Sequence, residues 1–441
     1  MRNFLVFNYF DESYWEYILF KNKPILQLII GTLVLLFLGL IYAWSIFGAS
    51  LATSFPSLSV SQLSMTFTIS IISFTLFSFF GGLLLKKHQA RLNLILTACM
   101  LLVGFWLSSL IDPKYPMKSL YRLYFFYGVL CSGGVGIGYN CVLSTVKKCF
   151  PNNVGLSSGI MLLGFGFGGL VLGSVVSFMI NSLGIYRVFR ILAVAIFAIS
   201  ILSSFVLVGP DETETGKKIV RVSKVKSLTP LEMLGDLRFW LYFIWAIIIT
   251  AAGLMVIGNA VNISFFYGGT AILGLLISLA NGSGRVVSGA MNDKFGVVFT
   301  LFCDSVLLLI GGSLLVLGAR TSNLFLVIFS MILVGIAYGG KSASSAAYAN
   351  AAFGEKYYAI NFSLVNFNLI PAAIMGPIMS ARLIEKSDGA YGSTFFAVVV
   401  LALVSILILI VFARADKNAT SSRNRSKTQG RKKKLGYAGA K

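Results

Sequence analysis

The sequence predicts an all-α membrane protein with twelve transmembrane helices arranged as two bundles of six. Hydrophobic residues make up 57% of the 441 residues, which is more apolar surface than a soluble globule can bury. Apolar runs recur along the whole chain, and each is long enough to cross a hydrocarbon core of roughly 30 Å. A polar and charged stretch divides these runs into six and six. The 44 glycines suit close helix packing in lipid.

Each apolar run is predicted to be one helix, with short polar loops between neighbours. In the first half the predicted helices are 25–51, 62–85, 92–111, 121–146, 155–180 and 188–208. In the second half they are 239–264, 270–291, 297–318, 324–348, 359–384 and 394–412.

The helices and the segments around them define five regions. These are an interfacial N-terminal segment at 1–23, a six-helix bundle at 24–208, a linker at 209–238, a second bundle at 239–412 and a basic tail at 413–441. The tail has no hydrophobic periodicity, so we expect it to be disordered and cytoplasmic, and to contact anionic lipid.

The distribution of basic residues predicts the orientation. With the N-terminus inside, the inner segments hold 26 of the 36 Lys and Arg, and the outer loops and helix ends hold eight. The positive-inside rule then places both termini in the cytoplasm of a multi-pass protein of the cell membrane. Because the net charge of +21 is concentrated in the tail and in loops on one side, it does not indicate nucleic-acid binding.

The sequence shows no pattern of an enzyme or a metal protein. The five cysteines lie in or beside apolar runs without metal spacing, and the single histidine, His88, belongs to no cluster. We therefore expect no cofactor, no metal and no enzymatic activity. A monomer is expected.

Arg285 is the candidate centre of function. It lies near the middle of the predicted helix 270–291, where a guanidinium costs on the order of 3 kcal/mol. Such a charge is tolerated when it faces a watery cavity or a partner, and a guanidinium fork matches the two oxygens of a carboxylate. The alternative is a structural ion pair that locks two helices. Asn281, one turn earlier, is a candidate to orient Arg285.

Lys341 is the second basic residue deep in an apolar helix. Tyr338 lies three residues before it on the same helix face, so both are candidates to line a pathway. The alternative for Lys341 is a snorkelling or helix-end lysine. Asp304 is the one acidic residue clearly within a predicted helix, and we expect it to form a structural pair. Without a carboxylate relay in the cavity, anion exchange or passive movement is favoured over carboxylate-driven proton symport.

Several motifs together resemble the major facilitator superfamily, and within it the oxalate/formate antiporter family, a relative of the monocarboxylate transporters. They are IYAWSIFG, GVGIGYN, FPNNVGLSSGIMLLGFGFG, NGSGR, NDKFG and AYGGKS. The resemblance extends from the first to the last predicted helix. It implies a major facilitator fold and an alternating-access carrier of small carboxylates.

The resemblance also implies specific site residues. It assigns substrate binding to Arg285 and an aromatic-lined cavity to Tyr42, Tyr139, Phe165 and Tyr338. Oxalate carriers of this family have a lysine in the eleventh helix, where this chain has Leu369. That difference puts oxalate in question but not carboxylates generally.

Two groups of residues are candidates for conformational roles. Asp293 and Lys294 resemble the superfamily loop that latches the two halves, whereas the matching first-half loop has Lys86 in place of an acidic residue. Pro371, Gly376 and Pro377 predict a kink or flexible segment in the eleventh helix.

The sequence therefore predicts a secondary transporter of a small organic anion, a mono- or dicarboxylate, that works by alternating access through exchange or facilitated movement. Two alternatives remain: a carboxylate sensor that keeps a carrier fold, or an efflux carrier of another small solute. Its expected partners are a small anionic solute and membrane lipids.

Overall fold

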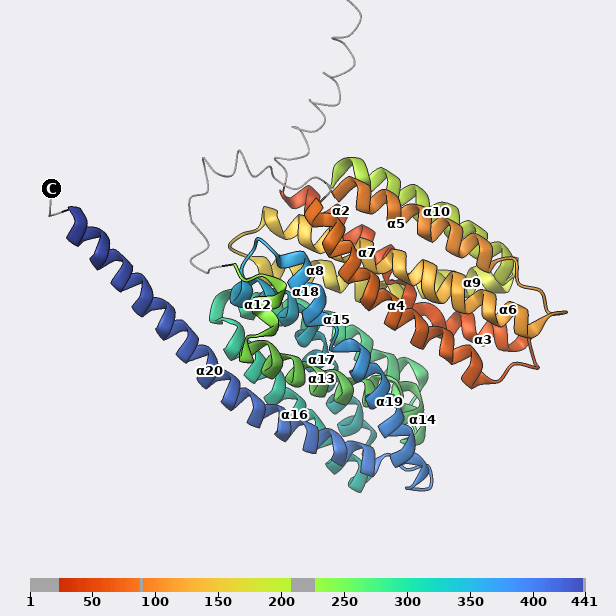
Figure 1. Cartoon of the computed structure of the whole chain (residues 1–441). Coiled ribbons are helices and arrows are strands. Elements are labelled where there is room, and N and C mark those ends of the chain that lie inside the picture. The colour runs from red at the N-terminus through yellow and green to blue at the C-terminus, as the bar shows by residue number, and fades with distance from the viewer. Residues whose placement is uncertain (1–23, 88–89, 208–226, 439–441) are drawn as a thin grey trace, which may run out of the picture.

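The computed structural model describes residues 24–87, 90–207 and 227–438. The predicted segment 1–23 and most of the predicted linker lie outside these ranges. Within them, 12 helices are long and apolar enough to span a membrane, which confirms the predicted number. Figure 1 shows the first-half helices and the second-half helices as two groups that lie side by side.

Six spans form the first bundle, and three of them are built from more than one helical element. The elements are α2 (Pro24–Leu38), the 3₁₀ segment η1 (Gly39–Ala43), α3 (Trp44–Ser54), α4 (Val60–Lys87), α5 (Ala90–Ser108), α6 (Pro116–Arg122), the π segment η2 (Leu123–Cys131), α7 (Ser132–Val146), the 3₁₀ turn η3 (Lys147–Cys149), α8 (Val154–Phe167), the π segment η4 (Gly168–Leu172), α9 (Gly173–Leu183) and α10 (Ile185–Val206).

The second bundle follows a short helix, α12 (Pro230–Leu234). Its elements are α13 (Leu237–Ile257), the short α14 (Ala260–Phe266), α15 (Ala271–Phe295), α16 (Val297–Thr321), α17 (Leu324–Phe353), α18 (Tyr358–Asn366), α19 (Leu369–Glu385) and α20 (Gly392–Ala438).

The first and fifth spans are irregular where they pack on each other. A Cβ at Gly39 would overlap the backbone oxygen of Phe165, and one at Gly168 would overlap that of Leu36. Glycine alone allows this approach of η1 to η4. Non-α backbone at membrane depth is tolerated where protein covers it, and such segments concentrate at functional sites. Tyr42 lies in η1.

The eleventh span is interrupted, as the prolines predict. α18 ends at Asn366 and α19 begins at Leu369, just before Pro371. A proline lacks the N–H that would bond to the carbonyl four residues earlier, and its ring clashes with that carbonyl. Pro377 lies inside α19, where a Cβ on the preceding Gly376 would lie 2.7 Å from the backbone oxygen of Ala251 in α13.

Two segments predicted to be irregular contain helix. The predicted disordered tail is helical through Ala438, because α20 continues past the membrane span (Figure 1). Its residues include many Lys, Arg and Ala, which are strong helix formers, and no proline. The end of the predicted linker also packs on the second bundle: the Leu228 N–H donates to the Phe353 carbonyl at 2.9 Å, and α12 begins with a capping box of Thr229 and Glu232.

Candidate functional site

Arg285 lies at the boundary between the two bundles. Its helix, α15, packs against α8 of the first bundle through small residues. A Cβ at Gly159 would overlap the backbone oxygen of Arg285, and a Cβ at Gly289 would overlap that of Gly155. Close backbone contact of this kind needs glycine. The helix pair therefore brings the arginine of one bundle directly against the other.

The guanidinium of Arg285 is buried but keeps unused donors. The residue is only 4% exposed, and its Nη1 donates to the Leu162 carbonyl of α8 at 2.5 Å. A Cβ at Gly166 would lie 3.1 Å from the guanidinium carbon, so this glycine leaves space for the group. The Nε atom has no hydrogen-bond partner. Since a guanidinium carries five N–H donors, the contact with α8 leaves donors for a ligand.

The three tyrosines that the family resemblance implied lie near Arg285. Tyr42 from η1, Tyr139 from α7 and Tyr338 from α17 each interact electrostatically with the guanidinium. Tyr42 also comes within hydrogen-bonding reach of it. Tyr42 is 37% exposed, so protein does not fully enclose its side chain. The structure thus gathers residues of four spans around one charge.

An aromatic wall adjoins these tyrosines on the first-bundle side. The Phe165 ring lies 5.3 Å from Tyr42 and 4.9 Å from Tyr139, measured between ring centroids. Two further rings extend the wall: Phe74 of α4 lies 5.1 Å from Tyr139, and Phe362 of α18, which comes from the second bundle, lies 6.1 Å from it. Phe74 and Phe362 could not be predicted from the sequence, because single phenylalanines in aromatic-rich apolar helices carry no distinguishing pattern.

Lys341 is fully buried near the arginine. It is 1% exposed, its Nζ donates to Asn368 Oδ1 at 2.5 Å, and it interacts electrostatically with Arg285. Asn368 directly precedes Leu369, the position where the family resemblance leads one to expect a lysine. The amine of Lys341 therefore reaches from α17 to the eleventh span, close to the place of the missing lysine.

Asn281 does not bond to Arg285. Its Oδ1 has no hydrogen-bond partner and lies beside Gly339 of α17, where an added Cβ would approach it to 3.0 Å. The bond to Leu162, rather than one to Asn281, holds the guanidinium. The amide oxygen of Asn281 is therefore a buried acceptor without a partner.

Asp293 joins the two bundles at one end. Its Oδ1 accepts from the Gly155 N–H at 2.8 Å and its Oδ2 accepts from the Leu156 N–H at 2.7 Å. Both amides belong to the first turn of α8, where unpaired N–H groups and the helix dipole favour an anion. Lys294 is exposed and lies 5.1 Å from the ring centroid of Phe295, within its own bundle.

Lys147 forms a second connection that the sequence analysis missed. Its Nζ donates to Asn350 Oδ1 of α17 at 2.7 Å and lies 3.4 Å from the ring centroid of Tyr358 in α18. Nearby, Asn140 Nδ2 donates to Ser363 Oγ at 2.5 Å. The sequence offered only a pair of loop lysines, Lys147 and Lys148, which counted toward the orientation.

These contacts close the bundles at one end. Along α8 and α15 the close contacts run from Gly155 against Gly289 to Phe167 against Gly282. On the other side of this level, α15 packs within its own bundle: an added Cβ at Gly274 would lie 2.7 Å from the backbone oxygen of Ala260 in α14. The structure is therefore closed on the Asp293 side of Arg285.

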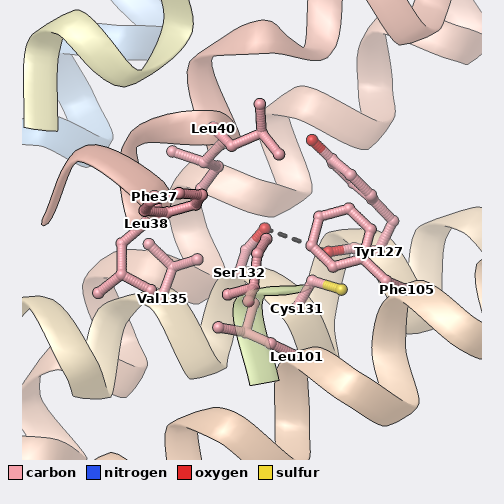
Figure 2. Close-up of a pocket in the computed structure, with 11 residues that line it drawn as sticks. Phe37, Leu38, Leu40, Leu101, Phe105, Tyr127, Cys131, Ser132 and Val135 are labelled. Carbon is pink, nitrogen blue, oxygen red and sulfur yellow. Dashed lines mark hydrogen bonds between the residues drawn. The ribbon is translucent and has the colours of Figure 1, made fainter. Parts of the chain in front are cut away.

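Two cavities lie away from Arg285. One of about 10 Å³, between Phe37, Leu101 and Tyr127 inside the first bundle, has room for about one water molecule. Figure 2 shows its lining, with the Ser132 hydroxyl bonded to the Tyr127 carbonyl at 3.1 Å. The other, of about 620 Å³, is an open groove between α16 and α20, bordered by Phe295 of α15, and has a mostly apolar lining. Neither brings together the groups described above.

The two six-helix bundles with a buried site between them define a membrane carrier. The chain matches the Major Facilitator Superfamily over residues 25–369 and again over 241–439. It belongs to that family and is a multi-pass membrane protein of a family of transporters.

Its relatives agree with this assignment. The oxalate:formate antiporter of Oxalobacter formigenes is 26% identical over 352 residues, which are 78% of this chain and 81% of that protein. The uncharacterised MFS-type transporter YhjX of Escherichia coli is 25% identical over 345 residues, which are 76% of this chain and 83% of that protein. The proton:xylose symporter XylE has the same fold, with a TM-score of 0.70 and 16% identity over 89% of this chain and 96% of its own.

Proposed function

We propose that this protein is a secondary transporter of a small organic anion, a mono- or dicarboxylate, that works by alternating access through exchange or facilitated movement. The observation that carries the proposal is the buried Arg285, which lies between the bundles with unused donors. The similarity to an oxalate:formate antiporter supports the choice of a carboxylate.

In this proposal each group near Arg285 has a distinct role. The guanidinium binds the carboxylate, because its parallel N–H donors match two oxygens. Tyr42 and Tyr338 donate hydroxyl hydrogen bonds, while Tyr139 and Phe165 pack against the apolar part of the solute. Lys341 adds positive charge, and Asn281 offers an amide to a polar substituent.

The conformational part of the proposal assigns the closed end to the cytoplasm. Both termini then lie in the cytoplasm of a cell-membrane protein, as the basic residues indicate, and the structure corresponds to an outward-facing state. Asp293 and Lys147 stabilise that state across the divide between bundles 24–208 and 239–412, which the linker 209–238 joins. The break before Pro371, with Gly376 and Pro377, allows the eleventh span to bend. We also propose that the protein is a monomer and that its basic tail contacts anionic lipid.

Proteoliposomes that contain the purified full chain test the function. We expect uptake of at least one of labelled oxalate, formate, lactate or pyruvate, stimulated by the same anion inside when exchange operates. Arg285→Ala abolishes this uptake, whereas Arg382→Ala, at an exposed arginine of the same bundle, preserves it. Absence of uptake of every small carboxylate, or full uptake by Arg285→Ala, would overturn the proposal. Tight binding without transport would instead indicate a sensor.

A further inference from the structure

A second polar cluster lies inside the second bundle, where α15, α16 and α17 meet. It consists of Ser288 and Asn292 of α15, Asp304 of α16 and Ser344 of α17, and is called the Asp304 cluster. Asp304 is 3% exposed and Asn292 is 6% exposed. None of these residues takes part in the proposed anion site. The predicted structural pair for Asp304 is a bond to a serine hydroxyl rather than to a base.

The hydrogen-bond donors of the cluster are largely committed. Ser288 Oγ donates to Asp304 Oδ1 at 2.9 Å. Asn292 Nδ2 donates to the Ser288 carbonyl at 2.7 Å and to Ser344 Oγ at 3.0 Å. The Ser344 hydroxyl also lies beside the Asp304 carboxyl group. Each of the two hydroxyls has one hydrogen and the Asn292 amide has two. All four of these hydrogens are thereby directed at acceptors.

Two buried acceptors in the cluster remain unsatisfied. Asp304 Oδ2 and Asn292 Oδ1 have no hydrogen-bond partner. In the described part of the chain, no basic group is placed on the carboxylate: Lys341 of α17 is directed to Asn368 instead. From α13, the Tyr242 hydroxyl bonds to Ser345 at 2.9 Å. An unpaired carboxylate buried at membrane depth is costly unless a proton or a cation neutralises it, and the cluster has more acceptors than donors.

We propose that the Asp304 cluster binds a monovalent metal cation of the size of Na⁺. The carboxylate, the Asn292 amide oxygen and the hydroxyl oxygens of Ser288 and Ser344 form the all-oxygen ligand set that hard cations prefer. A single positive charge neutralises the one carboxylate, whereas a divalent ion would leave a net charge in a low-dielectric interior. A proton would supply a donor for only one acceptor, while a metal ion satisfies several.

The position of the cluster links it to the anion site. α17 approaches closely here, because a Cβ on Gly340 would overlap both Ser288 Oγ and Asp304 Oδ1. A bound cation would hold α15 to α16 and α17. Arg285 lies one turn before Ser288 on the same helix, so the cation would fix the helix that carries the anion-binding group. The inference adds a co-ion to the proposed function but does not depend on it.

The test measures the thermal stability of the purified full chain without any organic anion. Unfolding temperatures are compared in NaCl, KCl and choline chloride at equal ionic strength and fixed pH. We expect a saturable rise specific to Na⁺, since a ligand that binds only the folded state stabilises it in proportion to the logarithm of its concentration. Glu385→Gln, at an exposed carboxylate of the same bundle, keeps the full response.

Variants of the cluster locate the effect. Asp304→Asn, which removes the charge but keeps the shape, abolishes the Na⁺ response, and Ser344→Ala raises the half-saturating Na⁺ concentration several-fold. If Asp304→Asn does not fold, the half-saturating Na⁺ concentration of Ser344→Ala alone tests the proposal. An equal response to Na⁺ and choline, stabilisation by acid alone, or an unchanged Na⁺ response in the variants would overturn the proposal.

Discussion

The two bundles contribute different chemistry to their common boundary. The first bundle presents an uncharged wall that includes Tyr42, Tyr139 and Phe165, whereas the second presents two buried basic side chains, Arg285 and Lys341. Two like charges in a low-dielectric interior repel each other, and an anion between them offsets the repulsion. The comparison teaches that neither bundle alone forms the site. In the proposed mechanism, an anion that binds Arg285 in the second bundle is enclosed only when the first bundle closes on it.

The largest expected effect comes from the charged side. Arg285→Lys keeps the charge but loses the planar fork, so we expect the apparent affinity for a carboxylate to fall about 10- to 100-fold. The measurement is the concentration dependence of uptake into proteoliposomes. Arg382→Lys, at an exposed site on α19, is the matched control. Unchanged affinity in Arg285→Lys would show that a point charge is enough to bind the carboxylate and that the planar guanidinium is not required.

Substitution of Lys341 tests whether the second bundle binds one or two anionic groups of the solute. Lys341→Met should lower oxalate uptake about tenfold and formate uptake less, because only a dianion offers a second carboxylate to the amine. Lys386→Met, at an exposed lysine of the same bundle, should change neither. Equal losses for the two substrates would assign Lys341 a structural role through Asn368.

The connections between the bundles should have a smaller effect. Lys147→Gln removes the cation–π contact with Tyr358, worth roughly 1 kcal/mol, and should shift the conformational equilibrium about fivefold toward opening at this end. Spin labels at the exposed Asn152 and Lys294 positions, in a cysteine-free background, report the separation. Lys148→Gln, one residue away and exposed, should leave the distances unchanged. If the spin-label distances in Lys147→Gln equal those in the wild-type protein, Lys147 does not stabilise the closed end.

The aromatic side should give the smallest changes. Tyr42→Phe and Tyr338→Phe each remove one hydroxyl and keep the ring, so the apparent affinity should fall about 2- to 10-fold. Phe74→Leu keeps the wall apolar and should have less effect. Uptake kinetics check all three. A loss as large as that of Arg285→Lys in Tyr42→Phe would mean that the first bundle, too, contributes an essential binding group.

The sequence predicted the architecture because membrane spans leave a strong hydropathy pattern. The number of spans, the two bundles and the interruption near Pro371 follow from length, composition and proline chemistry. The helical continuation of α20 was missed because its residues have helix propensity but no amphipathic pattern. The docking of residues 227–234 on the second bundle was missed because it depends on tertiary contacts with Phe353.

The site was predicted less completely. Arg285 and Lys341 stood out, since charges in apolar helices are rare, and the family resemblance supplied the tyrosines and Phe165. Phe74 and Phe362 could not be distinguished among many phenylalanines. The contacts of Lys147 could not be predicted, because a lysine at a helix end has the same local pattern whether it faces water or another bundle. The unpaired oxygens of Asp304 and Asn292 become visible only once three helices are placed together.

The central claim is that a negatively charged solute binds between the bundles. Its most direct test compares the thermal stabilisation of the purified full chain by a small carboxylate with that by its uncharged amide, for instance pyruvate and pyruvamide. The account predicts a saturable rise in unfolding temperature with at least one carboxylate and none with its amide. Equal stabilisation by acid and amide, or a larger effect of the amide, would contradict it.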